Sequence, residues 1–381
     1  MVKTQHILLA LLLVLSLSGC GQAEQAASRP EQDARAVTGD MALDYAERFT
    51  VDYYDDGCAF VTIDGSERYL IVPQDAEAPD GLDADITVLR TPMEHLYVAS
   101  SSVMDLFGKL DALDAVAATS TKAADWSLPE VLSAMDAGDI LYAGKYSAPD
   151  FELLLDEGCT LALENTMIYH SPDIMEQLES LGIPVLVERS GYEPHPLGRM
   201  EWIKLYGLLT GKEAEAEAFF AEQTEALAGI LSGESTGKSV SFFYISTNGY
   251  VNVRKPGDYI SKMIELAGGR YVPSAGDVEA EDNALSTMNM QAEAFYAAAK
   301  DADVLIYNAT IVGGMDTKEQ LLDKAEWLAD FKAVQTGNMW CTEQNMFQES
   351  SGVAGMIRDI HAVLSGEADG VDRLTYLHRI K

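Results

Sequence analysis

The sequence predicts an α/β protein with two lobes of mainly parallel sheet, joined by a single long α-helix and preceded by a small N-terminal antiparallel β-meander. Three observations predict this class. Beyond residue 85, short apolar runs alternate with capped helical segments, which is typical of parallel sheets covered on both faces. A long amphipathic segment interrupts that alternation in mid-chain. Three short strand-like runs separated by turn signals come first.

Residues 1–19 have the pattern of an export signal. Lys3 supplies a positive charge, and the apolar run 7–17 is too short to span a bilayer. The run closes on LSGC at residues 17–20, which resembles the lipobox of bacterial lipoproteins. We therefore expect cleavage before Cys20 and lipid on its thiol, which would anchor the protein outside the cytoplasm on the cell membrane. An ordinary secretory signal is the alternative.

Residues 20–40 predict a flexible tether, because they are rich in Ala, Gln, Glu, Ser and Arg and show no apolar periodicity. About 340 residues follow, which suits two domains. We expect an N-terminal lobe that includes the meander at 41–195, linking helices at 196–236 and a C-terminal lobe at 237–381.

The meander is expected within residues 49–72, where DDG and DGS separate three alternating runs. The N-terminal lobe then needs a first strand, Ile86–Leu89, and a helix, Ser102–Leu110. Further strands are expected at Val116–Ala118, Ile140–Tyr142, Thr160–Leu163 and Val185–Val187. Ser171 and Pro172 are good residues for the start of a helix between the last two strands.

Residues 210–232 predict the helix that joins the lobes. Thr210 and Glu213 have the spacing of a capping box, and Gly233 suits the end of the helix. An apolar stripe of six turns, about 30 Å, runs between them. Its members recur at spacings of three and four: Ala216, Phe219, Phe220, Gln223, Leu227, Ile230 and Leu231.

The second lobe repeats the pattern of the first. Its strands are expected at Val240–Ile245, Val304–Tyr307 and Asn338–Trp340, and its helices near Tyr259–Ala267, Gln291–Lys300, Lys318–Ala325 and Gly352–Leu364. A short helix opened by a glutamate leads into a strand and then an asparagine in both halves: Glu152 and Asn165, then Glu293 and Asn308. Two lobes built alike would place the carboxyl ends of their strands around a shared cleft.

Charge and cysteines narrow the function. With 26 basic against 61 acidic residues the formal charge is −35, so nucleic acid is not an expected partner. Beyond Cys20 the cysteines are Cys58, Cys159 and Cys341, and no two have metal-site spacing. We expect three small buried residues, although an exported protein could oxidise one pair of them, and the sequence does not predict a disulfide.

The segments GKYSAPDFELLLDEGCTLAL and LAGGRYVPSAG resemble the substrate-binding lipoproteins of ABC importers for iron complexes and cobalamin, a class of periplasmic binding proteins with Rossmann-like lobes joined by one helix. The resemblance spans about residues 85–364. It implies capture of a siderophore, haem or corrinoid, delivery to a permease and its ATPase, and docking through one glutamate per lobe, Glu152 and Glu293. It implies a monomer without catalytic residues, and without a bound cofactor apart from the lipid on Cys20.

Ligand residues should lie in loops that leave the strand ends. Tyrosines suit flat conjugated ligands, and Arg or Lys suits their carboxylates. The candidates are His95, Lys145, Tyr146, Asn165, Tyr169, His170, Tyr192 and Arg199 in the first half, and Tyr250, Arg254, Asn308 and Gln344 in the second.

Two other functions fit parts of the sequence. His95, His170 and His195 could converge on a bare transition-metal ion, although no helical ligand spacing joins them. Residues 233–237 spell G-x-S-x-G, a hydrolase motif, and the overlapping SGESTGKS is one position away from a phosphate loop. In both motifs the helix precedes and the strand follows, which is the reverse of the required order, so a polar loop is expected there.

Overall fold

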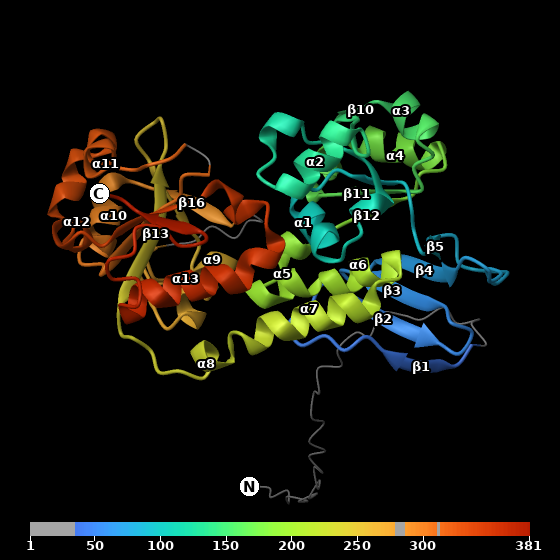
Figure 1. The fold of residues 1–381 in the computed structure, drawn as a ribbon, viewed down its shortest axis with the longest axis horizontal. Coiled ribbons are helices and arrows are strands. Elements are labelled where there is room, and N and C mark those ends of the chain that lie inside the picture. The colour runs from blue at the N-terminus through green and yellow to red at the C-terminus, as the bar shows by residue number, and fades with distance from the viewer. Residues whose placement is uncertain (1–34, 279–285, 311–312) are drawn as a thin grey trace, which may run out of the picture.

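The computed structural model of the chain describes residues 35–278, 286–310 and 313–381. The signal segment, Cys20 and the first part of the expected tether lie outside the described residues. Figure 1 shows two α/β lobes side by side, with α5, α6 and α7 crossing beneath them and a β-sheet below the N-terminal lobe. The α/β class with an N-terminal sheet is confirmed. Within the described part of the chain, no helix combines the length and apolarity needed to cross a membrane.

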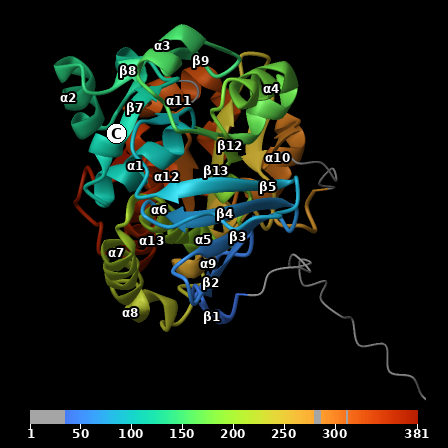
Figure 2. The ribbon, with the colours of Figure 1, turned by 90° about the vertical axis from the view of Figure 1, so that its right-hand side faces the viewer.

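The N-terminal sheet has five strands in the order β1-β2-β3-β4-β5, which Figure 2 shows stacked below the N-terminal lobe. Its strands are β1 (Val37–Asp40), β2 (Phe49–Tyr54), β3 (Ala59–Ile63), β4 (Glu67–Pro73) and β5 (Ile86–Thr91). The expected meander is confirmed as β2, β3 and β4.

Two strands extend this sheet beyond the expected meander. The strand expected to open the lobe is instead β5, which pairs parallel to β4, because a crossover of residues 74–85 returns the chain to the same sheet. The last residues of the expected tether form β1, whose pairing with β2 satisfies the backbone groups of that edge. The ordered chain therefore begins before residue 41.

The sheet of the N-terminal lobe is fully parallel, with the order β12-β11-β6-β7-β8. Its first strand, β6, was missed because it has only three residues. The strands are β6 (Leu96–Val98), β7 (Val116–Thr119), β8 (Leu141–Tyr142), β11 (Leu161–Glu164) and β12 (Val185–Val187). The helices are α1 (Ser101–Lys109), α2 (Pro129–Ala137), α3 (Phe151–Asp156) and α4 (Pro172–Ser180), and β9 (Gly144–Lys145) with β10 (Ala148–Pro149) forms a hairpin before α3.

Four helices carry the chain between the lobes: α5 (Pro196–Glu201), α6 (Ile203–Thr210), α7 (Glu213–Glu225) and α8 (Ala228–Leu231). The connecting helix is shorter than the sequence predicts. Thr210 ends α6 and donates its hydroxyl to the carbonyl of Tyr206, so the expected capping box does not form. Gly211 then adopts φ +72°, a conformation that glycine reaches without strain and that ends α6.

The apolar stripe of the connecting helix is confirmed although the helix is interrupted. Ala216, Phe220 and Leu227 are buried. The interruption follows Thr224, whose hydroxyl donates back to the carbonyls of Phe220 and Ala221, a contact that often bends helices.

The C-terminal lobe has a mixed sheet in the order β16-β14-β13-β17-β18-β19, with β15 also paired to β13. The central strands β13, β17 and β18 are parallel, and antiparallel strands close both sides. The strands are β13 (Ser239–Ile245), β14 (Val251–Arg254), β15 (Arg270–Tyr271), β16 (Thr287–Met290), β17 (Val304–Tyr307), β18 (Met339–Thr342) and β19 (Leu377–Arg379). The helices are α9 (Tyr259–Leu266), α10 (Ala292–Ala299), α11 (Lys318–Lys324), α12 (Lys332–Thr336) and α13 (Val353–Ser365).

One apolar core crosses the junction of the lobes. It runs from the N-terminal sheet through α1 and α5–α7 to α9 and α13, with Trp202, Tyr206 and Met356 among its buried members. Cys58, Cys159 and Cys341 are buried free thiols. The expectation of three small buried cysteines is therefore confirmed.

Polar contacts also join the two lobes. The carboxylate of Asp105 in α1 accepts a hydrogen bond from the backbone N–H of Ser351 at 2.7 Å. Gln348 accepts from the N–H and hydroxyl of Ser127 at 2.7 and 2.6 Å, and donates to the carbonyl of Asp125 at 2.7 Å. These contacts fix the N-terminal lobe against the segment that follows β18.

Residues 41–48, here called the strap, attach the N-terminal sheet to the connecting helices. Buried Glu201 of α5 accepts hydrogen bonds from three successive backbone N–H groups, those of residues 44–46, at 2.8–2.9 Å. Buried Glu193 accepts from the N–H groups of residues 47 and 48 and from the indole of Trp202. Two carboxylates therefore satisfy five strap amides that would otherwise need other partners.

Candidate ligand-binding cleft

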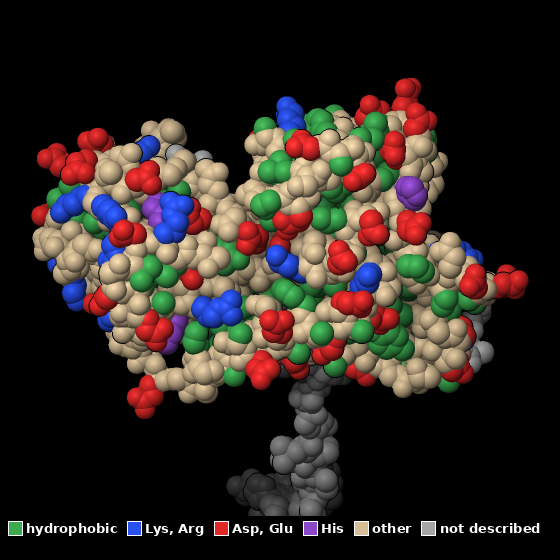
Figure 3. Space-filling view, in the orientation of Figure 1, with side chains coloured by type: hydrophobic (Ala, Val, Ile, Leu, Met, Phe, Trp, Pro, Cys, Tyr) green, Lys and Arg blue, Asp and Glu red, His purple; other side chains and the backbone are tan. Residues whose placement is uncertain are grey.

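The carboxyl ends of the central strands of both lobes meet at their junction. Helix α1 begins just beyond β6 and packs on η7 (Ser350–Gly352), a 3₁₀ turn that lies beyond β18. Figure 3 shows a deep hollow between the lobes above this contact. The arrangement matches the expectation that the cleft lies where the strands of two similar lobes end.

The loop after β11 and the turn after β12 build the N-terminal wall. Asn165 caps a 3₁₀ turn, its side-chain oxygen accepting from the N–H of Met167 at 2.9 Å. The hydroxyls of Thr166 and Tyr192 lie 3.0 Å apart, which joins the two loops. Met167 is 49% exposed and Tyr192 42% exposed, so this wall presents large apolar groups to solvent.

The loops beyond β13, β17 and β18 build the opposite wall. Tyr250, between β13 and β14, is 41% exposed. Asn308 is buried and accepts from the hydroxyl of Thr310 at 2.6 Å, so its side chain shapes the loop after β17. Gln344 is exposed just beyond β18. Of the candidates in this lobe, Tyr250 and Gln344 have surface available for a ligand.

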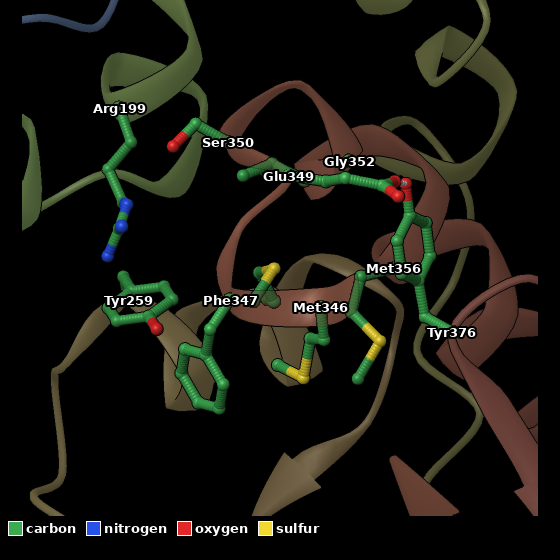
Figure 4. A pocket seen from close by; sticks show the side chains of 11 residues that line it. Arg199, Tyr259, Met346, Phe347, Glu349, Ser350, Gly352, Met356 and Tyr376 are labelled. Atoms are coloured by element: carbon green, nitrogen blue, oxygen red, sulfur yellow. Dashed lines mark hydrogen bonds between the residues drawn. The ribbon is translucent and has the colours of Figure 1, made fainter. Parts of the chain in front are cut away.

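Arginines and one aromatic ring occupy the junction below the walls. The guanidinium of Arg199, in α5, lies 4.0 Å from the ring centre of Tyr259, and that of Arg254 lies 4.8 Å from it. Buried Arg254 is ion-paired with Asp258. Burial raises the pKa of Asp258 although the Arg254 charge opposes the shift. Figure 4 shows Arg199 extending toward Tyr259 beside Phe347 and Met346.

Two further candidates lie away from the junction. His95 is exposed at the opposite edge of the sheet, just before β6, and holds φ +57°. It lines a groove with Arg90 and Pro184 rather than the cleft. Tyr169 donates its hydroxyl to Glu67 of the N-terminal sheet at 2.7 Å.

The remaining candidates are spread over the N-terminal lobe. Lys145 is exposed on β9. Tyr146 is partly buried and packs against a core cluster of that lobe that includes Tyr97 and Leu154. His170 is exposed at the end of the turn that Asn165 caps. The candidates that the structure places at the junction or in the loops that face it are Asn165, Tyr192, Arg199, Tyr250, Arg254, Asn308 and Gln344. Arg254 and Asn308 are buried.

The three histidines of the metal-ion alternative do not converge. His195 caps α5, its Nδ1 accepting from the N–H of Leu197 at 3.2 Å, and its ring stacks on Tyr45 at 4.5 Å. Burial, together with the charge of Lys262, lowers its pKa. Within residues 35–278, 286–310 and 313–381, no three His, Cys, Asp or Glu side chains are grouped so as to hold a metal ion.

A buried acid lies one residue before the capping asparagine. Glu164, at the end of β11, is 0% exposed and neither carboxyl oxygen has a hydrogen-bond partner in the described structure. Burial raises its pKa to about 8. The hydroxyl of Tyr97 on the neighbouring strand is also buried and unpartnered. Burial therefore favours the protonated, neutral form of Glu164.

The two glutamates expected to contact a permease occupy matching places. Glu152 is exposed in the first turn of α3, which precedes β11. Glu293 is exposed in the first turn of α10, which precedes β17. The G-x-S-x-G segment is a loop between α8 and β13, where Ser235 donates to the carbonyl of Gly268 at 3.1 Å. That context is the one expected for a polar loop.

Sequence reasoning missed two members of the junction, Tyr259 and Ser350. Tyr259 directly follows Asp258, which caps α9 by accepting from the N–H groups of residues 260 and 261. Ser350 stands in the ESSG run that precedes α13. A polar run at a helix start soon after a strand was a detectable signal, because strand-end loops form the cleft.

The model of a family described as periplasmic binding protein matches residues 97–345. An uncharacterized lipoprotein of Methanocaldococcus jannaschii is 24% identical over an alignment 395 positions long, which covers 97% of both chains. The periplasmic haem-binding protein HutB of Vibrio cholerae has a similar structure, with a TM-score of 0.58 and 18% identity over 72% of this chain and 99% of that one. A periplasmic haem-binding protein of Pseudomonas aeruginosa gives a TM-score of 0.55 and 14% identity over 76% and 98% of the two chains. At such identities the two structures establish the fold alone.

Proposed function

The chain belongs to the periplasmic binding protein family, and on that basis we propose that it captures an iron complex, haem or a corrinoid in the cleft and delivers it to an ABC importer. Members of this family are extracytoplasmic binding proteins that work with ABC-transporter permeases. The observation that carries the proposal is the junction of strand ends from two similar lobes, with exposed Met167, Tyr192 and Tyr250 on the loops beside it. Such side chains suit a large, flat, partly apolar ligand.

The proposal includes attachment of the protein through lipid on Cys20. The lipobox-like sequence at residues 17–20 supports this anchor, and the aligned relative from Methanocaldococcus jannaschii is named as a lipoprotein. The domain is proposed to act outside the cytoplasm, as a monomer and without catalytic residues.

Titration of the protein, expressed without residues 1–20, tests the ligand class. We expect haemin, a ferric siderophore or cyanocobalamin to bind at micromolar concentration or below and to change either the ligand's absorbance or the fluorescence of Trp126, which is buried beside the contact of Gln348 with Ser127. Tyr192→Ala and Tyr250→Ala should each weaken binding about tenfold, the loss expected when an aromatic contact worth roughly 1.4 kcal/mol is removed.

Leu181→Ala is the matched control for these variants. Leu181 is an exposed apolar residue before β12, at the edge of the sheet away from the cleft, so its loss should leave affinity unchanged. Equal losses in all three variants would place the ligand elsewhere. Tight binding of zinc ions, with none of the three chelate classes bound, would instead support the bare-metal alternative.

A further inference from the structure

We propose that the small cavity where α5 meets the C-terminal lobe is an anion subsite that receives a carboxylate of the ligand, with Arg199 as its cation and Ser350 as its hydroxyl donor. This inference rests on the proposed binding function and specifies the ligand class. The cavity is lined from one side by Arg199 and from the other by α9, by the segment after β18 and by the start of α13. It therefore lies between the linking helix α5 and the C-terminal lobe (Figure 4).

Arg199 is a cation without a carboxylate partner. Its Nε is buried and makes no hydrogen bond, and no ion pair joins it to a described residue. Its contact in this structure is the Tyr259 ring, 4.0 Å from the guanidinium carbon. Arg254, on the same ring, is neutralised by Asp258. In a chain with 61 acidic and 26 basic residues, an arginine without an acidic partner is unusual, and because Arg199 is partly exposed an anion from outside can reach it.

Ser350 supplies a second unused donor in the same cavity. Its side chain is 5% exposed and its hydroxyl has no partner in the described structure. A buried hydroxyl without a hydrogen-bond partner destabilises the folded protein, and a hydrogen bond to a ligand oxygen would remove that cost. Ser350 also precedes α13, a helix of 13 residues whose N-terminal dipole favours negative charge nearby.

The nearby acid is already engaged and points away. The carboxylate of Glu349 accepts from the hydroxyl of Tyr376 at 2.6 Å and from the amide of Asn345 at 3.0 Å. Figure 4 shows this carboxylate directed toward Tyr376, on the side opposite Arg199. Both donors on the Arg199 side remain available to an incoming anion.

The size and walls of the cavity define what enters it. Its volume is about 20 Å³, close to the space that one water molecule occupies. Apolar side chains form much of the wall: Met263, Met346, Phe347 and Met356. Ionic contacts strengthen in such surroundings. A cavity of this size admits only a small terminal group, such as an oxygen of a carboxylate, and the rest of the ligand would lie outside it. The inferred class is a metal chelate with free carboxylates, such as haem or a carboxylate siderophore, rather than an amide-bearing corrinoid.

Two matched pairs of probes test the subsite: haemin against its dimethyl ester, and a ferric carboxylate chelate against a neutral ferric hydroxamate. We expect the protein to bind the acid of at least one pair at least tenfold more tightly than the neutral partner. Arg199→Gln should weaken binding of that acid by about 10–100-fold, the range expected for a hydrogen bond to a charged group, and remove the preference. Ser350→Ala, which leaves the Tyr259 stack intact, should weaken it several-fold.

Arg358→Gln is the control, because Arg358 is exposed on α13 outside this cavity. It should change neither affinity nor preference. The Arg199→Gln variant must melt at the same temperature as the parent for this comparison to count. If a neutral probe or cyanocobalamin then binds tightly to both proteins with equal affinity, the subsite is overturned and the proposed binding function is retained. Failure of all these probes to bind would overturn the proposed function itself.

Discussion

At the scale of single residues, the protein buries carboxylates in contrasting ways. Glu201 receives three backbone N–H groups and an ion pair with Lys204. Glu188, buried at the end of β12, receives the hydroxyls of Ser100 and Ser190. Glu164 receives no hydrogen bond from the described residues. The first two are stabilised as hydrogen-bond acceptors, whereas Glu164 is kept in the structure as a neutral group.

Glu164→Gln is expected to stabilise the protein at neutral and alkaline pH. The pKa of Glu164 is raised from 4.5 to about 8, so the folded state binds more protons than the unfolded state between these values. Stability therefore falls as pH rises through that window. The neutral amide avoids this loss, and the gain in free energy of unfolding should approach about 3 kcal/mol at pH 7, at 1.36 kcal/mol per pKa unit. It should vanish near pH 4.

Urea denaturation at pH 5 and pH 8 measures this difference. Glu152→Gln provides the control, because Glu152 is exposed and the same chemical change there should have little effect at either pH. If the stability of Glu164→Gln relative to the parent does not increase from pH 5 to pH 8, the raised pKa of Glu164 is contradicted.

At the scale of elements, the two lobes use the same order of helix and strand to place an exposed acid. Helix α3 leads into β11, and α10 leads into β17, and both strands are interior strands of their sheets. A glutamate in the first turn suits the helix dipole in either case. The recurrence at matching places in two lobes is what supports a shared role for Glu152 and Glu293.

The double substitution Glu152→Ala and Glu293→Ala should abolish ligand uptake by cells while leaving the affinity of the purified protein unchanged. The reason is that both side chains are exposed and neither lines the cavity beside Arg199. Transport assays and titrations on the same variant check this. Glu319→Ala with Glu215→Ala, which removes two other first-turn acids, is the control pair, and a fall in affinity would assign the first pair to the cleft instead.

At the scale of the whole molecule, several independent connections hold the lobes in one arrangement. The apolar core is continuous through α5–α7 into α9 and α13. Asp105 and Gln348 add hydrogen bonds between the lobes. The break between α7 and α8 does not act as a free hinge, because Leu227 at that point is buried. Closure by a large rotation would have to disrupt all of these contacts.

Small-angle scattering of the protein with and without saturating ligand should therefore give nearly the same radius of gyration, about 20 Å for a compact chain of this length. Asp105→Ala combined with Gln348→Ala should loosen the junction and make the two profiles differ. A clear contraction of the parent protein on ligand binding would contradict the rigid junction.

The sequence predicts most elements correctly where apolar periodicity decides them. Patterns of two and of three to four residues locate β2, β3, β4 and α13 because burial repeats with the geometry of each element. These patterns do not show which strand pairs with which. Residues 86–91 have a strand pattern that would suit the N-terminal sheet or the sheet of the N-terminal lobe. Their pairing with β4 depends on the crossover before them, and no sequence motif marks that crossover. The polar run that contains Ser350 is visible in the sequence, but the burial of Ser350 is not, because it depends on tertiary packing.

The N-terminal sheet also sets the side of the molecule on which the described chain begins. In Figure 1 the strand β1, where the described chain begins, lies at the bottom, and the cleft opens at the top. If lipid is attached to Cys20 as proposed, the 15 residues from there to Arg35 span at most about 50 Å. The cleft then lies on the side of the molecule opposite the point where the described chain begins. To present the cleft to a transporter in the same membrane, the anchored protein must rotate about its point of attachment. Shortening residues 21–34 should therefore slow uptake without altering the affinity for ligand.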